Sequence, residues 1–119
     1  MVYVDDMRAK YRQMVMCHMI ADTDAELHEM AARIGVRRRW HQHPPEHDSH
    51  YDICLAMRRT AVAAGAIQIT WRQAGAMILR RRVTGWLGSP DDALAWHVGR
   101  VSEGKSRGGA NPKHATASR

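Results

Sequence analysis

The stretch "MVMCHMIADTDAELHEMAARIG", residues 14–35, joins a strand pattern directly to a helix pattern. Residues 14–20 are apolar except for His18, which is typical of a central strand buried on both faces. Thr23 and Glu26 have the spacing of a capping box at a helix start, and Gly35 suits the helix end. Between them lies an apolar stripe at helical spacing, formed by Leu27, Met30, Ala31 and Ile34. The stretch therefore predicts an α/β protein.

The flanking residues extend this pattern into a complete small fold. "VYV" at residues 2–4 predicts a short strand, and its link to residues 14–20 is too short for a parallel crossover, so we expect an antiparallel hairpin. Further elements are expected at 38–41 (a possible short strand), 54–64 (helix), 66–71 (strand), from Thr70 (a capped helix) and from Ser89-Pro90 (a last helix). We predict a small single-domain α/β sandwich with a mixed three- to four-stranded sheet and about four helices.

The charge distribution separates the body of the chain from its end. The formal net charge is +6, and residues 99–119 hold five basic residues against one acidic residue. We predict a compact domain over residues 1–101 and a basic disordered tail over residues 102–119, because the latter lack core-forming side chains. The body is only mildly basic, which weakens the case for nucleic-acid binding by the fold itself.

Cysteine usage and hydropathy point to the cytoplasm. Cys17 and Cys54 lie in apolar stretches and form no CxxC pair, so we expect two free thiols in a reducing compartment. No apolar run approaches the roughly 20 residues that span a bilayer. We expect a cytoplasmic protein with no membrane partner.

The first candidate functional residues lie at or near the ends of the first two predicted strands and on the helix that follows them. Asp5 and Asp6 end a strand, where they could hold a divalent metal or cap the following turn. His18 could be a core residue or a functional one. Asp24 and His28 are spaced i, i+4, so they could orient a ligand imidazole or form an ordinary helix pair.

The richest set of ligand types is "WHQHPPEHDSHYD", residues 40–52. It contains His41, His43, His47 and His50. Neutral imidazole suits Zn, Ni, Cu or Fe, but the spacing matches no zinc template, so a plain polar loop is the alternative.

Basic residues follow and flank this segment. We expect Asp52 to lead into a helix, with Arg58 and Arg59 placed to clamp a phosphate or to remain solvated charges. The arginine runs at 37–39 and 80–82 suit solvated faces, and with Trp40 and Trp86 nearby they could stack on a base.

The segments "VYVDDMRA", "MCHMIADTDAELHEMAARIG", "HYDI" and "AVAAGAIQIT" together resemble the bacterial and phage family of domain of unknown function 4031. The resemblance covers about residues 1–75, and "MVYVDDM" looks like the phage-type branch. The positions that match the family pattern are Asp5, His18, Asp22, Glu26, Leu27, His28, His50, Tyr51 and Asp52. The resemblance implies a fold and a candidate site but no reaction, and it favours a functional His18 over His41, His43 and His47.

Our leading interpretation is a phage-type accessory protein that binds a phosphate-bearing ligand, a nucleotide or nucleic acid. The phosphate contacts would come from His18, His28, His50 and Arg58. Tyr51 or Trp40 would stack on a base, while Asp5 and Asp52 would orient the histidines.

Two alternatives belong to other functional classes, and enzymatic activity stays open. One is a metal-dependent phosphodiester hydrolase or nuclease with a divalent metal held by Asp5, His18, His50 and Asp52. The other is a non-enzymatic interaction protein that acts on a host partner through its basic tail. The hairpin argues partly against the metal site, because Asp5 is expected at the edge opposite the end of the strand that carries His18.

Overall fold

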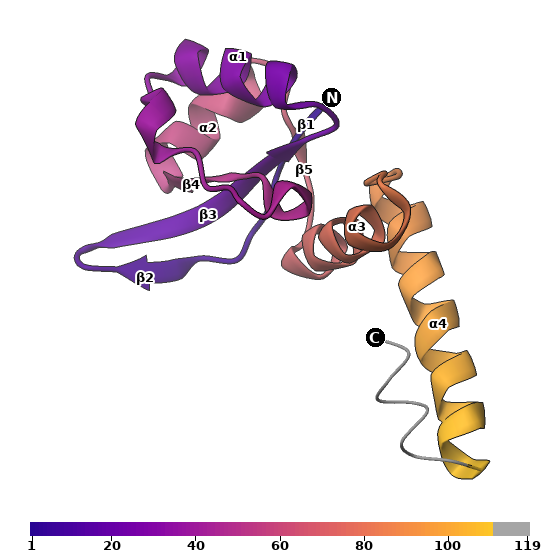
Figure 1. Ribbon diagram of the computed structural model, residues 1–119. Helices are drawn as coiled ribbons and strands as arrows, with labels where there is room; N and C mark the ends of the chain where they lie inside the picture. Colours follow the sequence, from indigo (N-terminus) through magenta and orange to yellow (C-terminus); the bar gives the residue numbers. More distant parts are fainter. Residues whose placement is uncertain (111–119) are drawn as a thin grey trace.

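A computed structural model describes residues 1–110 of the chain, in which a mixed five-stranded sheet has helices on both faces (Figure 1). The strands are β1 (Val2–Val4), β2 (Ala9–Tyr11), β3 (Met14–Ala21), β4 (Tyr51–Cys54) and β5 (Ile67–Gln68). The helices are α1 (Asp24–Ile34), α2 (Leu55–Ala63), α3 (Trp71–Thr84) and α4 (Pro90–Ala110), with 3-10 turns η1 (Arg38–Trp40) and η2 (Glu46–Asp48). The α/β class and the four helices are confirmed, whereas the predicted strand number is slightly too low.

Strand β3 organises the sheet because three other strands pair with it. β1 and β2 pair antiparallel with its two halves, and β4 pairs antiparallel along its middle. Met16 is paired with Ala9 on one edge and with Cys54 on the other, so β1 and β2 share one edge of β3 and β4 occupies the opposite edge. β5 then adds to β1 in parallel. The expected antiparallel hairpin between residues 2–4 and 14–20 is confirmed.

The edge formed by β1 and β2 is interrupted at residues 5–8. Val4 is opposite Met19 and Ala9 is opposite Met16, so four residues of this edge face only two residues of β3. Arg8 has a φ of +52°, a conformation that residues other than glycine seldom adopt. Such an interruption bends an edge and re-aims side chains, and here it begins at Asp5.

Two hydrophobic cores lie on the two faces of the sheet. Met19 and Tyr51 point to the face that α1 and α2 cover, together with Leu27 of α1. Tyr3 and Ile20 point to the other face, where α3 packs and Ala93 at the start of α4 joins the core. Since neighbouring residues of a strand point to opposite faces, His18 shares the α3 face with Ile20.

The helix ends follow their sequence signals. The Thr23 side chain accepts a hydrogen bond from the amide of Glu26, and Gly35 ends α1 with a φ of +85°. Thr70 and Gln73 form a reciprocal capping box at the start of α3. These caps satisfy backbone groups that the helices leave unpaired.

Three local predictions need correction. Residues 9–11 lie in the link between the first two predicted strands, for which no strand is predicted, but they form β2. This strand is exposed along its length and therefore lacks the alternating pattern of a half-buried strand. Residues 38–41 do not form a strand, because Arg38–Trp40 is a 3-10 turn. Tyr51–Cys54 is a strand that precedes α2, so Asp52 lies within the sheet and not at a helix start.

Helix α4 is described as far as Ala110, and residues 111–119 of the predicted tail lie outside the described part of the chain. The division into a compact domain over residues 1–101 and a tail over residues 102–119 stays a prediction. No helix among the described residues is both long and apolar enough to cross a membrane. Cys17 and Cys54 are free thiols, as expected.

Candidate functional site

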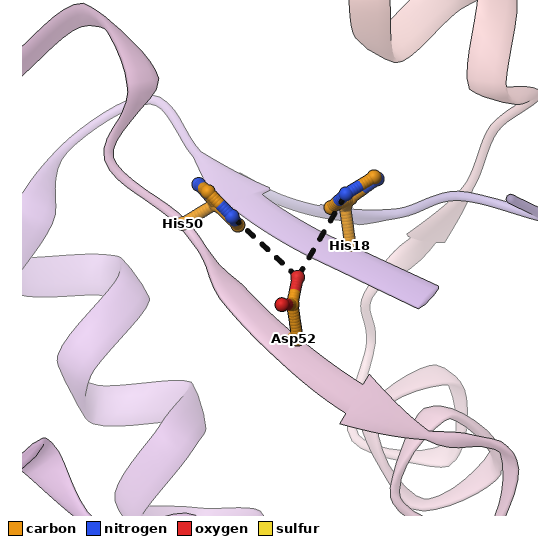
Figure 2. A group of neighbouring side chains, drawn as sticks. All are labelled: His18, His50 and Asp52. Carbon is orange, nitrogen blue, oxygen red and sulfur yellow. Dashed lines mark ion pairs between the residues drawn. The ribbon is translucent and has the colours of Figure 1, made fainter. Parts of the chain in front are cut away.

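A cluster of two histidines and an aspartate lies on the α3 face of the sheet (Figure 2). His18 of β3 and Asp52 of β4 are direct cross-strand partners, and His50 lies two residues before Asp52 on the same face. The Nε2 atoms of His18 and His50 lie 3.7 and 3.5 Å from Oδ1 of Asp52. One ligand atom from each residue falls within 4.8 Å of the others, which is close enough to share one metal ion.

The imidazole of His18 is held by Asp5, which is only 1% exposed. Oδ2 of Asp5 lies 2.8 Å from Nδ1 of His18, and Oδ1 accepts the backbone N–H of His18 at 2.7 Å. An ionised carboxylate only accepts hydrogen bonds, so Nδ1 of His18 carries the proton. In the neutral ring the lone pair is then on Nε2, which faces Asp52.

The interruption of the first strand explains how Asp5 reaches this position. Its amide donates to the carbonyl of His18 at 3.0 Å, so the two residues are directly opposite each other. The backbone carbonyl of Asp5 accepts a hydrogen bond from Nε of Arg58 at 2.7 Å. The amide of His18 therefore donates to the carboxylate of Asp5 and not to its carbonyl. Asp5 therefore does not lie at the edge away from His18, contrary to the hairpin argument.

His50 and Asp52 have supporting contacts of the same kind. Nδ1 of His50 donates to the carbonyl of Asp48 at 2.6 Å, so Nε2 of a neutral ring carries no proton and has a lone pair. Oδ2 of Asp52 accepts from Nε2 of Gln42 at 2.7 Å. Gln42 is itself held by paired backbone hydrogen bonds with His50. Sequence reasoning missed Gln42, since a glutamine in a polar loop carries no signal of its own.

Charge coupling shifts the pKa values across the cluster. The hydrogen bond to Asp5 raises the pKa of His18. Burial alone would raise the pKa of Asp5, but the bonds from His18 outweigh it and lower that pKa. Burial opposes charge on His50, yet the carboxylate of Asp52 and the carbonyl of Asp48 raise its pKa overall. His50 in turn lowers the pKa of Asp52. A cation entering the cluster would replace protons, so its affinity should depend on pH.

The donor set fits a divalent transition metal. Two imidazole nitrogens and one carboxylate are common protein ligands of zinc and of non-haem iron, with further positions left for water or substrate. Ligand histidines in such sites hold their second nitrogen in a hydrogen bond to a carboxylate or carbonyl. His18 and His50 both meet that description through Asp5 and Asp48.

Other predicted site residues lie elsewhere. His28 lies on the α1 side, where its Nδ1 is 2.8 Å from the hydroxyl of Tyr51. We predicted that Tyr51 or Trp40 stacks on a base. Tyr51 is 0% exposed, so its ring has no face open to a ligand. Trp40 is 58% exposed, with the guanidinium of Arg39 lying 5.1 Å from its ring centroid.

Arg58 borders a separate pocket of about 350 Å³. The pocket lies beyond the carboxyl ends of the parallel strands β1 and β5 and includes Arg8, Arg58 and Thr70. In open α/β sheets, ligands often bind at this edge. Asp6 also lines it, and its carboxylate accepts the amide of Trp71 at the start of α3.

The second arginine run contains a structural residue. The guanidinium of Arg81 donates to the carbonyls of His47 at 2.7 Å, Ala21 at 3.2 Å and Ser49 at 3.2 Å. Arg81 thereby attaches the segment before His50 to the end of β3 and to α3. We expected the run to be solvated or to contact a base, whereas burial lowers the pKa of Arg81 among these carbonyls.

Fold and site together define a small α/β domain whose central strands carry a His-His-Asp cluster supported by a buried aspartate. Residues 2–81 match the family model described as Protein of unknown function (DUF4031), and the chain belongs to that family. The matched range contains the whole cluster, the pocket and Arg81, and α4 lies after it. No curated protein and no solved structure matches the chain.

Proposed function

We propose that the protein is a metal-dependent phosphate-ester hydrolase that acts on a nucleotide or nucleic acid. The observation that carries the proposal is the geometry of His18, His50 and Asp52, whose free donor atoms converge while their other polar atoms are held. Side chains with a purely structural role would not need this convergence. The three side chains are 12 to 39% exposed, so they could have pointed into water instead of toward one another.

The chemistry needs a nucleophile and neutralisation of phosphate charge. A divalent metal at the cluster would lower the pKa of water enough to supply hydroxide near neutral pH. Asp5 holds His18 in the tautomer that presents Nε2, and Gln42 fixes the orientation of Asp52. Hydrolysis places the water oxygen on phosphorus and the water proton on the departing ester oxygen.

Arg58 links the cluster to the neighbouring pocket and supports phosphate as the recognised group. Its Nε holds the carbonyl of Asp5, whose carboxylate holds His18, and its side chain lines the pocket beside Arg8. Guanidinium groups pair well with phosphate oxygens. In this proposal the two arginines bind phosphate, and base stacking by the exposed Trp40, which does not line the pocket, stays a prediction.

A second candidate is nucleotide binding without hydrolysis, which the basic pocket favours independently of the cluster. The phage-type origin, the cytoplasmic location and a host partner contacted through the basic C-terminal residues stay predictions.

The test measures hydrolysis of bis(para-nitrophenyl) phosphate and of single-stranded DNA and RNA by the full chain. The protein is first stripped with a chelator and then supplied with Zn²⁺, Mn²⁺ or Fe²⁺. We expect activity only with metal, and losses of at least about 100-fold in His18→Ala and Asp52→Asn. His47→Ala is the matched control, because His47 lies in the same segment but outside the cluster.

Two outcomes would contradict metal-dependent hydrolysis at this cluster. Hydrolysis that survives both the chelator and His18→Ala would place the chemistry elsewhere. Metal-independent nucleotide binding with no turnover, weakened by Arg58→Ala and Arg8→Ala, would favour the binding function of the pocket.

A further inference from the structure

A second group of ligand-type side chains lies on the opposite face of β4 from the first. Asp24, His28 and His41 place one ligand atom each within 4.8 Å of one another. Tyr51 points to this face, whereas His50 and Asp52 on either side of it point to the first cluster. The proposed hydrolase chemistry uses none of these three residues.

Two different segments bring the group together. Asp24 and His28 lie one turn apart on α1, and His41 immediately follows the 3-10 turn η1. The ring centroids of His28 and His41 are 4.5 Å apart at an interplanar angle of 86°. The ring of His43 follows at 4.2 Å from that of His41. Three imidazoles and one carboxylate therefore gather where the loop over residues 36–50 meets α1.

In His28 and His41, a hydrogen bond to a buried partner holds one of the two ring nitrogens. Nδ1 of His28 is bonded to the hydroxyl of Tyr51, so Nε2 is its available nitrogen. Nε2 of His41 lies 2.7 Å from Oγ of Ser49. The Ser49 hydroxyl donates its only hydrogen to Oδ1 of Asp24 at 2.7 Å, so it must accept from Nε2–H of His41. That leaves Nδ1 of His41 with a lone pair.

These contacts repeat the pattern of the first cluster with different side chains. Ser49 is 2% exposed and Tyr51 is 0% exposed, so the supporting groups are rigid parts of the core. A polar loop that merely covered α1 would need no such support. Histidines that bind a metal regularly have their other nitrogen fixed in this way.

We propose that Asp24, His28 and His41 form a second divalent-metal site. His43 lies next to His41 but outside this group. Two imidazoles and a carboxylate, with a fourth position left open, form a donor set that suits tetrahedral Zn²⁺. The site would attach the loop over residues 36–50 to α1. That loop carries Gln42 and leads into His50, so metal at the second site would also hold supports of the first cluster in place.

The test is the metal content of the full chain after loading with Zn²⁺ and desalting, measured by elemental mass spectrometry. We expect two ions per wild-type chain, one in His41→Ala, one in His18→Ala and none in the double variant. His47→Ala is the matched control and should retain two. Circular dichroism of each variant verifies that the fold is present.

The design tests the two sites independently. If His41→Ala loses one ion per chain while His18→Ala keeps the wild-type number, the result supports the second site and contradicts the first. Metal that is unchanged in His41→Ala would overturn the second site, whatever His18→Ala shows. If His41→Ala does not fold, Asp24→Asn replaces it, since Asp24 is exposed at the helix start. Zinc affinity within about tenfold of wild type in a chelator competition would then overturn the proposal.

Discussion

The two faces of β4 carry histidine clusters with opposite acid–base behaviour. On the α3 face, the carboxylates of Asp5 and Asp52 raise the pKa of His18 and His50 despite burial. On the α1 face, burial lowers the pKa of His28 and His41, and the charge of Arg38 adds to that effect. The comparison shows that the neighbours of an imidazole decide its proton affinity, even when one short strand supports both sites.

The clusters also differ in how they are supported. Asp5, a buried charge, holds the first cluster, whereas the neutral hydroxyls of Ser49 and Tyr51 hold the second. Hydrogen bonds to charged groups are about twice as strong as those between neutral groups. Removing a support should therefore cost more on the α3 face than on the α1 face.

The largest expected effect comes from Arg81, because it serves both clusters. Arg81→Met removes three hydrogen bonds to backbone carbonyls and should lower the free energy of unfolding by about 3 kcal/mol. Arg82→Met, the next residue on α3 and exposed, should change it by less than about 0.5 kcal/mol. Urea unfolding measures both, and equal effects would show that Arg81 has no structural role.

Asp5→Asn tests the first cluster alone. The variant keeps the shape of the side chain but removes the charge that binds the ring and amide of His18, and we expect a loss of about 2 kcal/mol. Proton uptake by His28 should be unchanged, because His28 lies on the other face. A loss as small as that of an exposed substitution would contradict the role of the buried carboxylate.

The same variant predicts a pH window. The folded pKa of His18 is raised above 6.5, so its contribution is complete below that pH and is lost as the pH rises through the folded value. The folded pKa of Asp5 is lowered below 3.8, so its contribution is complete above that pH and is lost as the pH falls through the folded value. The difference in stability between wild type and Asp5→Asn should be largest between pH 3.8 and 6.5.

Tyr51→Phe tests the support of the second cluster. The ring remains in the core and only the hydroxyl that contacts His28 is lost, so we expect a decrease of about 1 kcal/mol in the free energy of unfolding. Tyr11→Phe is the control, because Tyr11 is exposed on β2. If the two variants lose the same stability, the bond to His28 contributes nothing.

The finest test compares the four imidazoles in the metal-free protein. NMR titration of their ring protons should place the pKa of His18 and His50 above 6.5 and that of His28 and His41 below it. Asp5→Asn should lower the pKa of His18 and leave His28 in place. Four values on the same side of 6.5 would remove the contrast between the faces.

Local signals predicted much of the fold because they act over a few residues. The capped helix after Thr23, the Thr70–Gln73 capping box and the first hairpin depend on spacing within one segment, and all are observed. β2 and β4 escaped prediction because they have three and four residues, and pairing with β3 rather than their own composition makes them strands.

By itself, the sequence determined the residue types of both clusters, the α/β class and the family pattern that includes His18, His28 and His50. Only the tertiary structure decided which of those residues meet. Placing Asp5 opposite His18 required the interruption at residues 5–8, and separating His28 from His50 required β4 to turn alternate side chains to opposite faces. The physical reason is that register and side-chain direction arise from backbone pairing between distant segments, which no local pattern in the chain encodes.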